Sequence, residues 1–231
     1  MCEQIKNVLR VFPFLCLILS GCEKGDGYGE SFFSKSFITD YVYPDTLETY
    51  GVETVGDTMS VRMGFKGNYH VAPLAYRNFA DWEQREHLFD SLMVRYADTT
   101  YNEDVYVEGH KALANPIESI TVVSDADYDK NHVAGSDLSD LVIFQGFSYG
   151  SFVLHGYFRE EDSYWIYYNG NGAELNKPLS EFCSEDYHLW KFSSFELKFP
   201  QPTLSQVHHI TFTFVTGGRT FTVTEELDFN D

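Results

Sequence analysis

The C-terminal segment of the chain alternates apolar and polar residues on both sides of two adjacent glycines, Gly217 and Gly218. Paired glycines adopt the positive φ angles of a two-residue type I′ turn without steric cost, so the flanking residues are predicted to form a β-hairpin. The pairing sets Phe214 opposite Phe221, with apolar residues on one face of the hairpin and threonines on the other. A slip of one residue would exchange the two faces, so the register is strongly specified. The phenylalanine face therefore requires a second sheet to cover it.

Short strand patterns also precede this hairpin. They cover residues 60–65, 69–76, 117–123, 141–144, 151–158, 163–168 and 192–199. A helix is predicted after Asp81, with Gln84 completing a capping box. Leu88, Phe89 and Leu92 follow at helical spacing and are expected to form its packing face. The sequence thus predicts a mainly β fold, an antiparallel β-sandwich of the Greek-key, Ig-like type with one short helix.

The first residues have the organisation of a bacterial export signal. A basic start precedes an apolar stretch over residues 11–19, which is too short to span a bilayer as a helix. The following tetrad, Leu-Ser-Gly-Cys, resembles the lipobox of bacterial lipoproteins, in which the cysteine is acylated and becomes the mature N-terminus. We therefore predict a signal peptide over residues 1–21 and a lipid on Cys22. The alternative is a signal peptide cut elsewhere, with Cys22 an ordinary cysteine.

The expected anchor divides the chain into three parts. After the signal peptide, residues 22–36 are predicted to form a lipidated flexible tether, because glycines and polar residues dominate its start. Residues 37–231 are predicted to form the β-sandwich domain. Each acyl methylene that enters a bilayer contributes about 0.8 kcal/mol, so lipidated Cys22 is the predicted contact with the membrane. The expected location is the bacterial outer membrane, on its periplasmic or its surface face.

Charge and cysteine content restrict the partners. The formal net charge is −19, which argues against nucleic acid as a partner because its phosphates are bound by Lys and Arg. Cys183 is the one cysteine that follows the predicted anchor, so no disulfide is expected within the domain. We interpret Cys183 as a half-buried apolar side chain. The partners that remain are another envelope protein or a glycan.

An acidic segment is the candidate for an ion site. Asp125, Asp127 and Asp129 alternate along the chain and precede Asn131, a pattern that resembles the start of a calcium loop. The segment departs from the EF-hand pattern, since Lys130 stands where the sharp turn requires glycine. A structural calcium ion is the one cofactor that this segment predicts. The alternative is a solvated loop after a strand, in which aspartates favour turn conformations.

An aromatic run at residues 164–168 is the candidate for ligand stacking. On a strand, Trp165 and Tyr167 share one face and the other members of the run share the opposite face. One of these faces should belong to the core, and Trp165 and Tyr167 are then the predicted platform for a sugar ring. The alternative is that both faces pack against neighbouring strands.

Motifs that would identify an enzyme are scarce. The sequence has no His-Glu-x-x-His zinc motif, no Walker loop and no dinucleotide fingerprint. Carboxylates are so numerous that no single pair stands out as a glycosidase pair. A non-catalytic role is therefore predicted, while a hydrolase remains an alternative.

Three segments together resemble a pattern in Bacteroidetes-type lipoproteins that carry a domain of unknown function. They are residues 111–121, 125–129 and 132–140. With the lipobox, this resemblance implies a membrane-anchored position outside the cytoplasm. It also implies that residues 125–140 are a feature of the family, which favours a structural loop. The resemblance implies no activity.

These observations lead to three functional hypotheses. The first is a lipid-anchored, non-catalytic binding or scaffolding protein of the cell envelope. The second is a surface glycan-binding lipoprotein for nutrient capture, which an exposed aromatic platform would favour. The third is an extracytoplasmic hydrolase, which two carboxylates about 5–10 Å apart in a cleft would favour.

Overall fold

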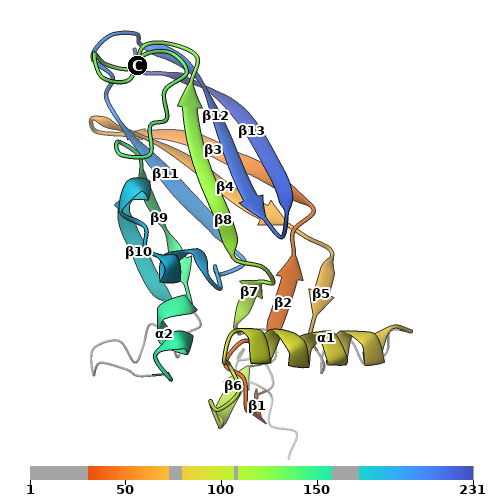
Figure 1. Cartoon of the computed structure of the whole chain (residues 1–231). Helices are drawn as coiled ribbons and strands as arrows, with labels where there is room; N and C mark the ends of the chain where they lie inside the picture. Colours follow the sequence, from red (N-terminus) through yellow and green to blue (C-terminus); the bar gives the residue numbers. More distant parts are fainter. Residues whose placement is uncertain (1–30, 73–79, 107–108, 158–171, 231) are drawn as a thin grey trace, which may run out of the picture.

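The computed structural model describes residues 31–72, 80–106, 109–157 and 172–230, which form a mainly β structure (Figure 1). The strands are β1 (Ser31–Ser34), β2 (Asp40–Tyr43), β3 (Thr46–Val55), β4 (Thr58–Lys66), β5 (Tyr69–Val71), β6 (Glu103–Tyr106), β7 (Lys111–Leu113), β8 (Ile117–Ser124), β9 (Ile143–Ser148), β10 (Ala173–Pro178), β11 (Ser194–Pro200), β12 (Val207–Thr216) and β13 (Arg219–Asp228). The helices are α1 (Trp82–Arg95) and α2 (Gly150–Leu154), with 3₁₀ turns at Leu179–Glu181 and Ser184–Tyr187.

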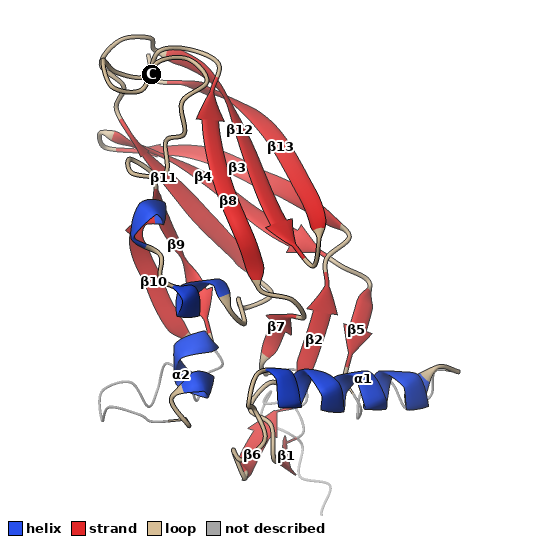
Figure 2. Cartoon of the chain, in the orientation of Figure 1, coloured by secondary structure: helices blue, strands red, loops and turns tan. Residues whose placement is uncertain are grey.

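Two antiparallel sheets form the larger part of the molecule, and both helices lie at one end of it (Figure 2). One sheet has five strands in the order β10-β9-β11-β4-β3, and the other has three in the order β13-β12-β8. Along β4, Met59, Val61 and Met63 are buried, whereas Ser60 and Arg62 alternate with them on the opposite side. The structure thus confirms the predicted antiparallel β-sandwich.

Aromatic side chains fill the space between the two sheets. Phe65 of the five-stranded sheet meets Phe214 and Phe221 of the other sheet edge to face, at centroid distances of 5.7 and 5.5 Å. Phe144 and Phe195, on neighbouring strands, stack at 5.3 Å. Such pairs contribute about 0.5–1.5 kcal/mol each beyond the area that they bury. This core holds both sheets in place and leaves their other sides facing outward.

The C-terminal hairpin has the predicted register. Phe214 pairs with Phe221 and Thr213 with Thr222, and the turn glycines have φ angles of 58° and 68°. The phenylalanines point into the core, as the alternation requires. On its other side, β12 pairs with β8, which completes the three-stranded sheet.

A second, smaller core lies at the helical end of the molecule. Strand β2 pairs with β5 antiparallel and with β7 parallel, and α1 lies beside this small sheet (Figure 1). Its centre is Phe37, whose ring stacks on His110 at 3.8 Å and meets Phe152 of α2 edge to face. Phe89 and Leu92 supply the buried face of α1. The predicted helix and these packing residues are therefore confirmed.

The predicted capping box of α1 is wrong. Asp81 stands at the N-cap position but makes no side-chain hydrogen bond to the helix backbone. Its carboxylate instead accepts a hydrogen bond from Arg85 Nε at 3.0 Å, one turn along the helix. A charged partner at i+4 thus replaces the uncharged backbone donors that a capping box would use.

Two other expectations differ from the structure. The described part of the expected strand 151–158, residues 151–157, does not form a strand, since 150–154 are helix α2, whose Phe152 and Val153 are both buried in the smaller core. Successive residues of a strand point to opposite faces, whereas a short helix can place two adjacent residues in the same core. In addition, β1 pairs with β6 at residues 31–34, within the range 22–36 predicted as a tether. The expected strand at 163–168 and part of that at 69–76 lie outside the described residues.

Candidate functional site

The acidic segment follows β8 and forms a loop at the end of the sandwich opposite the helices. Asp125 accepts a hydrogen bond from the backbone N–H of His209 at 2.8 Å, and its second oxygen lies 2.8 Å from His209 Nδ1. The backbone hydrogen bond first, and then the imidazole, lower the pKa of Asp125. Asp127 accepts a hydrogen bond from the N–H of Ala134 at 2.8 Å. Asp125 therefore ties the start of the loop to strand β12, whereas Asp127 bonds within the loop.

The other members of the segment are also bound locally. Asp129 accepts hydrogen bonds from the N–H groups of Asn131 and His132 at 2.7 and 2.9 Å. The ring of His132 bridges two carboxylates, with Nδ1 2.9 Å from Asp129 and Nε2 3.0 Å from Asp140. We call this arrangement of Asp129, His132 and Asp140 the histidine clasp.

The structure does not assemble the predicted calcium site. Ca²⁺ requires six to eight converging oxygen atoms, whereas the oxygens of Asp125, Asp127 and Asp129 face backbone amides and imidazoles. Within residues 31–72, 80–106, 109–157 and 172–230, no group of three or more His, Cys, Asp or Glu side chains is arranged to hold a metal ion. The geometry instead matches the alternative of a structural loop. Sequence reasoning missed His132 and His209, which organise it.

The other predicted site residues are placed as follows. Cys22, Trp165 and Tyr167 lie outside the described residues. Cys183, expected to be half-buried, is exposed. Its N–H donates a hydrogen bond to Asp186 at 2.6 Å, and this short turn keeps the thiol at the surface.

A serine motif that the sequence reasoning missed runs from β9 into α2. Residues 146–150 read Gly-Phe-Ser-Tyr-Gly, the spacing of a hydrolase nucleophile elbow, at a strand-to-helix junction. Ser148, however, is buried, and its hydroxyl donates a hydrogen bond to the carbonyl of His188 at 2.7 Å. Its oxygen also accepts a hydrogen bond from the N–H of Gly150 at 2.9 Å. The hydroxyl thus ties two segments together and is not presented to a substrate as an exposed elbow would be.

A carboxylate and an imidazole pair in the smaller core. Asp40 of β2 lies 2.6 Å from Nδ1 of His70 on the neighbouring strand β5, and it also accepts the N–H of Val71 at 3.2 Å. Burial raises the pKa of Asp40, and the hydrogen bond to His70 opposes that shift. His70 lies opposite Val42, two residues from Asp40, so the pair is a diagonal contact that joins β2 to β5.

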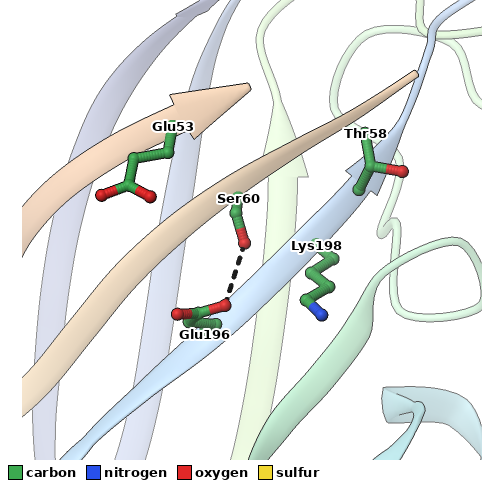
Figure 3. Close-up of a pocket in the computed structure, with 5 residues that line it drawn as sticks. All are labelled: Glu53, Thr58, Ser60, Glu196 and Lys198. Atoms are coloured by element: carbon green, nitrogen blue, oxygen red, sulfur yellow. Dashed lines mark hydrogen bonds between the residues drawn. The ribbon is translucent and has the colours of Figure 1, made fainter. Parts of the chain in front are cut away.

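A further candidate site is on the outer face of the five-stranded sheet, the side turned away from the core. A pocket of about 260 Å³ there is lined by Glu53, Thr58, Ser60, Glu196 and Lys198 (Figure 3). These residues come from β3, β4 and β11, and strand pairing sets Ser60 between Glu53 and Lys198. The pocket is therefore built by alternation on three adjacent strands.

Charge is balanced across this face. The Nη2 atom of Arg62 lies 3.8 Å from Glu53 and 3.4 Å from Glu196, so one guanidinium stands between the two carboxylates. Ser60 Oγ donates to Glu196 at 3.3 Å, and the ammonium of Lys198 lies at the other side of the pocket (Figure 3). Acidic, basic and hydroxyl groups thus lie within one small area.

An aromatic ring lies on the same face. Strand β3 has a bulge at Tyr50, which sets Tyr50 and Gly51 opposite Arg62. A Cβ atom at Gly64 would lie 2.9 Å from the Tyr50 ring, so the ring occupies the space that a side chain at position 64 would need. Tyr50 remains 44% exposed, which leaves aromatic surface accessible to a ligand.

Comparison with known proteins assigns this chain to no family. The chain matches no protein-family model, no curated protein and no solved structure. Among the described residues, no helix has the length and apolar character needed to cross a membrane.

The outer-face site was missed by the sequence reasoning for a definable reason. Glu53, Ser60 and Glu196 are ordinary polar residues, and no local motif contains them. The bulge at Tyr50 also breaks the alternation that would have indicated β3. The site exists because strand pairing brings together residues more than a hundred positions apart in the sequence.

Proposed function

We propose that this chain is a lipid-anchored envelope protein of the bacterial outer membrane that binds another molecule and does not catalyse a reaction. Cys22 carries the lipid in this proposal, and residues following it connect the anchor to the sandwich. The observation that supports binding is the outer face of the five-stranded sheet, where a pocket with hydrogen-bonding groups lies beside exposed Tyr50.

The same face favours binding over hydrolysis. In a glycosidase, two carboxylates flank the scissile bond and one of them donates a proton to it. Glu53 and Glu196 instead both pair with the guanidinium of Arg62, at 3.8 and 3.4 Å. A cation shared by the two carboxylates suits them to hold a ligand in place and not to cleave it.

The anchor is tested by labelling cells with a radioactive or clickable fatty acid. We expect the full chain to incorporate the label and to sediment with the outer membrane, and we expect Cys22→Ser to lose both properties. An unlabelled wild-type protein recovered from the soluble fraction would contradict the anchor.

The binding face is tested by photo-crosslinking on intact cells. A photoreactive residue replaces Thr58, which lines the pocket, and in a matched protein replaces Thr222, on the outer side of β13. We expect cross-linked adducts from position 58 and few from position 222. Equal adducts from both positions, or adducts from position 222 alone, would contradict the assignment of the face.

A further inference from the structure

We propose that the outer face of the five-stranded sheet binds a neutral polysaccharide, with one sugar ring against Tyr50 and the hydroxyls of a neighbouring unit in the pocket of Glu53, Ser60 and Glu196. This inference rests on the proposed function, because it names the chemical class of the ligand for the same face.

The positions of Tyr50 and the pocket require an extended ligand. Tyr50 lies against Gly64, and Ser60 is four residues away on the same strand, β4. A strand advances about 3.4 Å per residue, so roughly 14 Å of strand separates Gly64 from Ser60. The pocket, at about 260 Å³, is also smaller than the sites that enclose whole drug-sized ligands. A chain molecule that places one unit in the pocket and another at Tyr50 satisfies both observations.

The hydrogen-bonding groups of the pocket match sugar hydroxyls. Glu53 and Glu196 accept hydrogen bonds, Lys198 donates them, and the hydroxyls of Thr58 and Ser60 do both. The contact of Ser60 with Glu196 is 3.3 Å long and that of Arg62 with Glu196 is 3.4 Å, both longer than strong charge-assisted bonds. Replacing or sharing these weak contacts with a ligand hydroxyl therefore costs little binding free energy.

The exposed ring supplies the apolar half of the recognition. The face of an aromatic ring carries partial negative charge and attracts weakly positive hydrogen atoms. The C–H groups on one side of a sugar ring are such hydrogens, while its hydroxyls point outward to the polar neighbours. The ammonium of Lys66 lies over the Tyr50 ring, 5.1 Å from its centroid, and Arg62 lies opposite the bulge. Polar groups thus adjoin the ring, and a sugar ring would stack beside the Lys66 ammonium or in its place. This combination suits a sugar better than a purely apolar ligand.

Charge disfavours the other large classes of ligand. Phosphates and uronic acids would meet Glu53 and Glu196 as well as Arg62 and Lys198, so this face offers an anion no net positive charge, on a protein of net charge −19. Protein interfaces are depleted in Glu and Lys at their centres, and covering the Arg62–Glu196 pair would remove its water. A neutral, hydrated polymer adds no charge and leaves these groups partly solvated.

The test is calorimetric titration of the full chain in detergent micelles. The ligands are soluble starch, galactomannan, xyloglucan and mixed-linkage glucan, with polygalacturonate as the acidic control. The variants are Tyr50→Ala and Glu196→Gln on the outer face and Thr222→Ala on the opposite sheet as the matched control. We expect at least one neutral polymer to bind, Tyr50→Ala to weaken that binding about fivefold or more, and Thr222→Ala to leave it unchanged.

Several results would overturn the inference. They are binding by none of the four neutral polymers, equal binding of polygalacturonate, and binding that both Tyr50→Ala and Glu196→Gln leave unaltered. Thermal melts of each variant verify folding, and Lys198→Ala replaces any variant that melts early. If no polymer binds while position 58 still cross-links on cells, the polysaccharide is wrong and the proposed function stands.

Discussion

Nε2 of His132 lies 3.0 Å from a carboxylate oxygen of Asp140, while Nδ1 of the same ring lies 2.9 Å from Asp129. Burial disfavours the charged imidazole, but hydrogen bonds and charge attraction from the two aspartates outweigh it and raise the pKa of His132. The N–H groups of Asn131 and His132 and the imidazole together lower the pKa of Asp129. The histidine clasp is therefore an ionic bridge across the loop that follows β8.

The clasp should make this loop sensitive to pH. A raised pKa for His132 contributes stability that is complete below about pH 6.5 and is lost as the pH rises through the folded value. The lowered pKa of Asp129 contributes stability above about pH 4 that is lost on acidification. The loop should thus be most stable between these limits.

Amide hydrogen exchange measures this effect directly. The N–H of Gly135 donates to Ser124 and that of Leu138 donates to Val122, and both should lose protection between pH 6.5 and 8.5 after correction for the intrinsic rate. His132→Gln should abolish the pH dependence at these two amides. The amide of Phe212, in the core strand β12, is the control. An unchanged pH profile in His132→Gln would show that the clasp is not responsible.

Asp98 should be important for the stability of the smaller core. Its buried carboxylate accepts hydrogen bonds from the N–H groups of Phe37 and Ile38, at 2.8 and 2.9 Å, and from the hydroxyls of Ser36 and Tyr157. Asp98→Ala should lower the free energy of unfolding by about 3 kcal/mol, because buried donors lose their acceptor. Denaturant melts of the variant and the wild type check this value.

Asp98 should also give the stability a defined pH dependence. Burial raises the pKa of Asp98 despite the hydrogen bonds that it accepts. Its contribution is therefore complete below about pH 4 and is lost as the pH rises through the folded pKa. Asp98→Asn does not titrate, so the stability difference between wild type and Asp98→Asn should shrink from pH 4 to pH 7. A difference that grows over this range would reverse the assigned sign.

Adjacent residues of β12 should respond very differently to truncation. Phe212 is fully buried between the sheets, where it meets Phe199, and Phe212→Ala should cost about 3–5 kcal/mol. Thr213, the next residue, faces outward opposite Thr222, and Thr213→Ala should change stability by no more than about 0.5 kcal/mol. Similar losses in both variants would mean that the sheet register is incorrect.

Two glycines of the five-stranded sheet region provide a further matched comparison. A Cβ atom at Gly67 would lie 2.3 Å from the carbonyl oxygen of Tyr43, a backbone atom that cannot rotate away. Gly67→Ala should therefore cost about 2 kcal/mol. A Cβ atom at Gly51 would meet nothing within 4 Å, so Gly51→Ala should be neutral or stabilising by up to about 1 kcal/mol. Thermal melts distinguish these outcomes, and equal effects would count against the close approach at Gly67.

Local sequence patterns predicted the elements whose stability is largely local. The hairpin around Gly217 was predicted in its register because its alternation and its turn agree, and helix α1 was predicted from the spacing of Phe89 and Leu92. The strand expected at 151–158 was wrong, since Phe152 and Val153 are both buried against residues distant in sequence. An alternating pattern cannot distinguish a strand from a short buried helix when tertiary contacts decide.

The candidate sites were less predictable than the fold. The pattern of Asp125, Asp127 and Asp129 suggested an ion, but the partners of these carboxylates depend on where His209 and Ala134 lie after folding. The outer-face pocket has no local pattern at all. Its side chains meet because β4 pairs with β3 on one side and with β11 on the other.

The sequence by itself determined that this chain forms antiparallel sheets with one apolar face each, since alternation and paired glycines act between near neighbours along the chain. Only the tertiary structure decided which polar side chains meet. Glu53 and Glu196 share the guanidinium of Arg62 although strand order, and not sequence distance, brings them together. The physical reason is that hydrogen bonds and ion pairs act over a few ångströms, so partners exist only after the strands have paired.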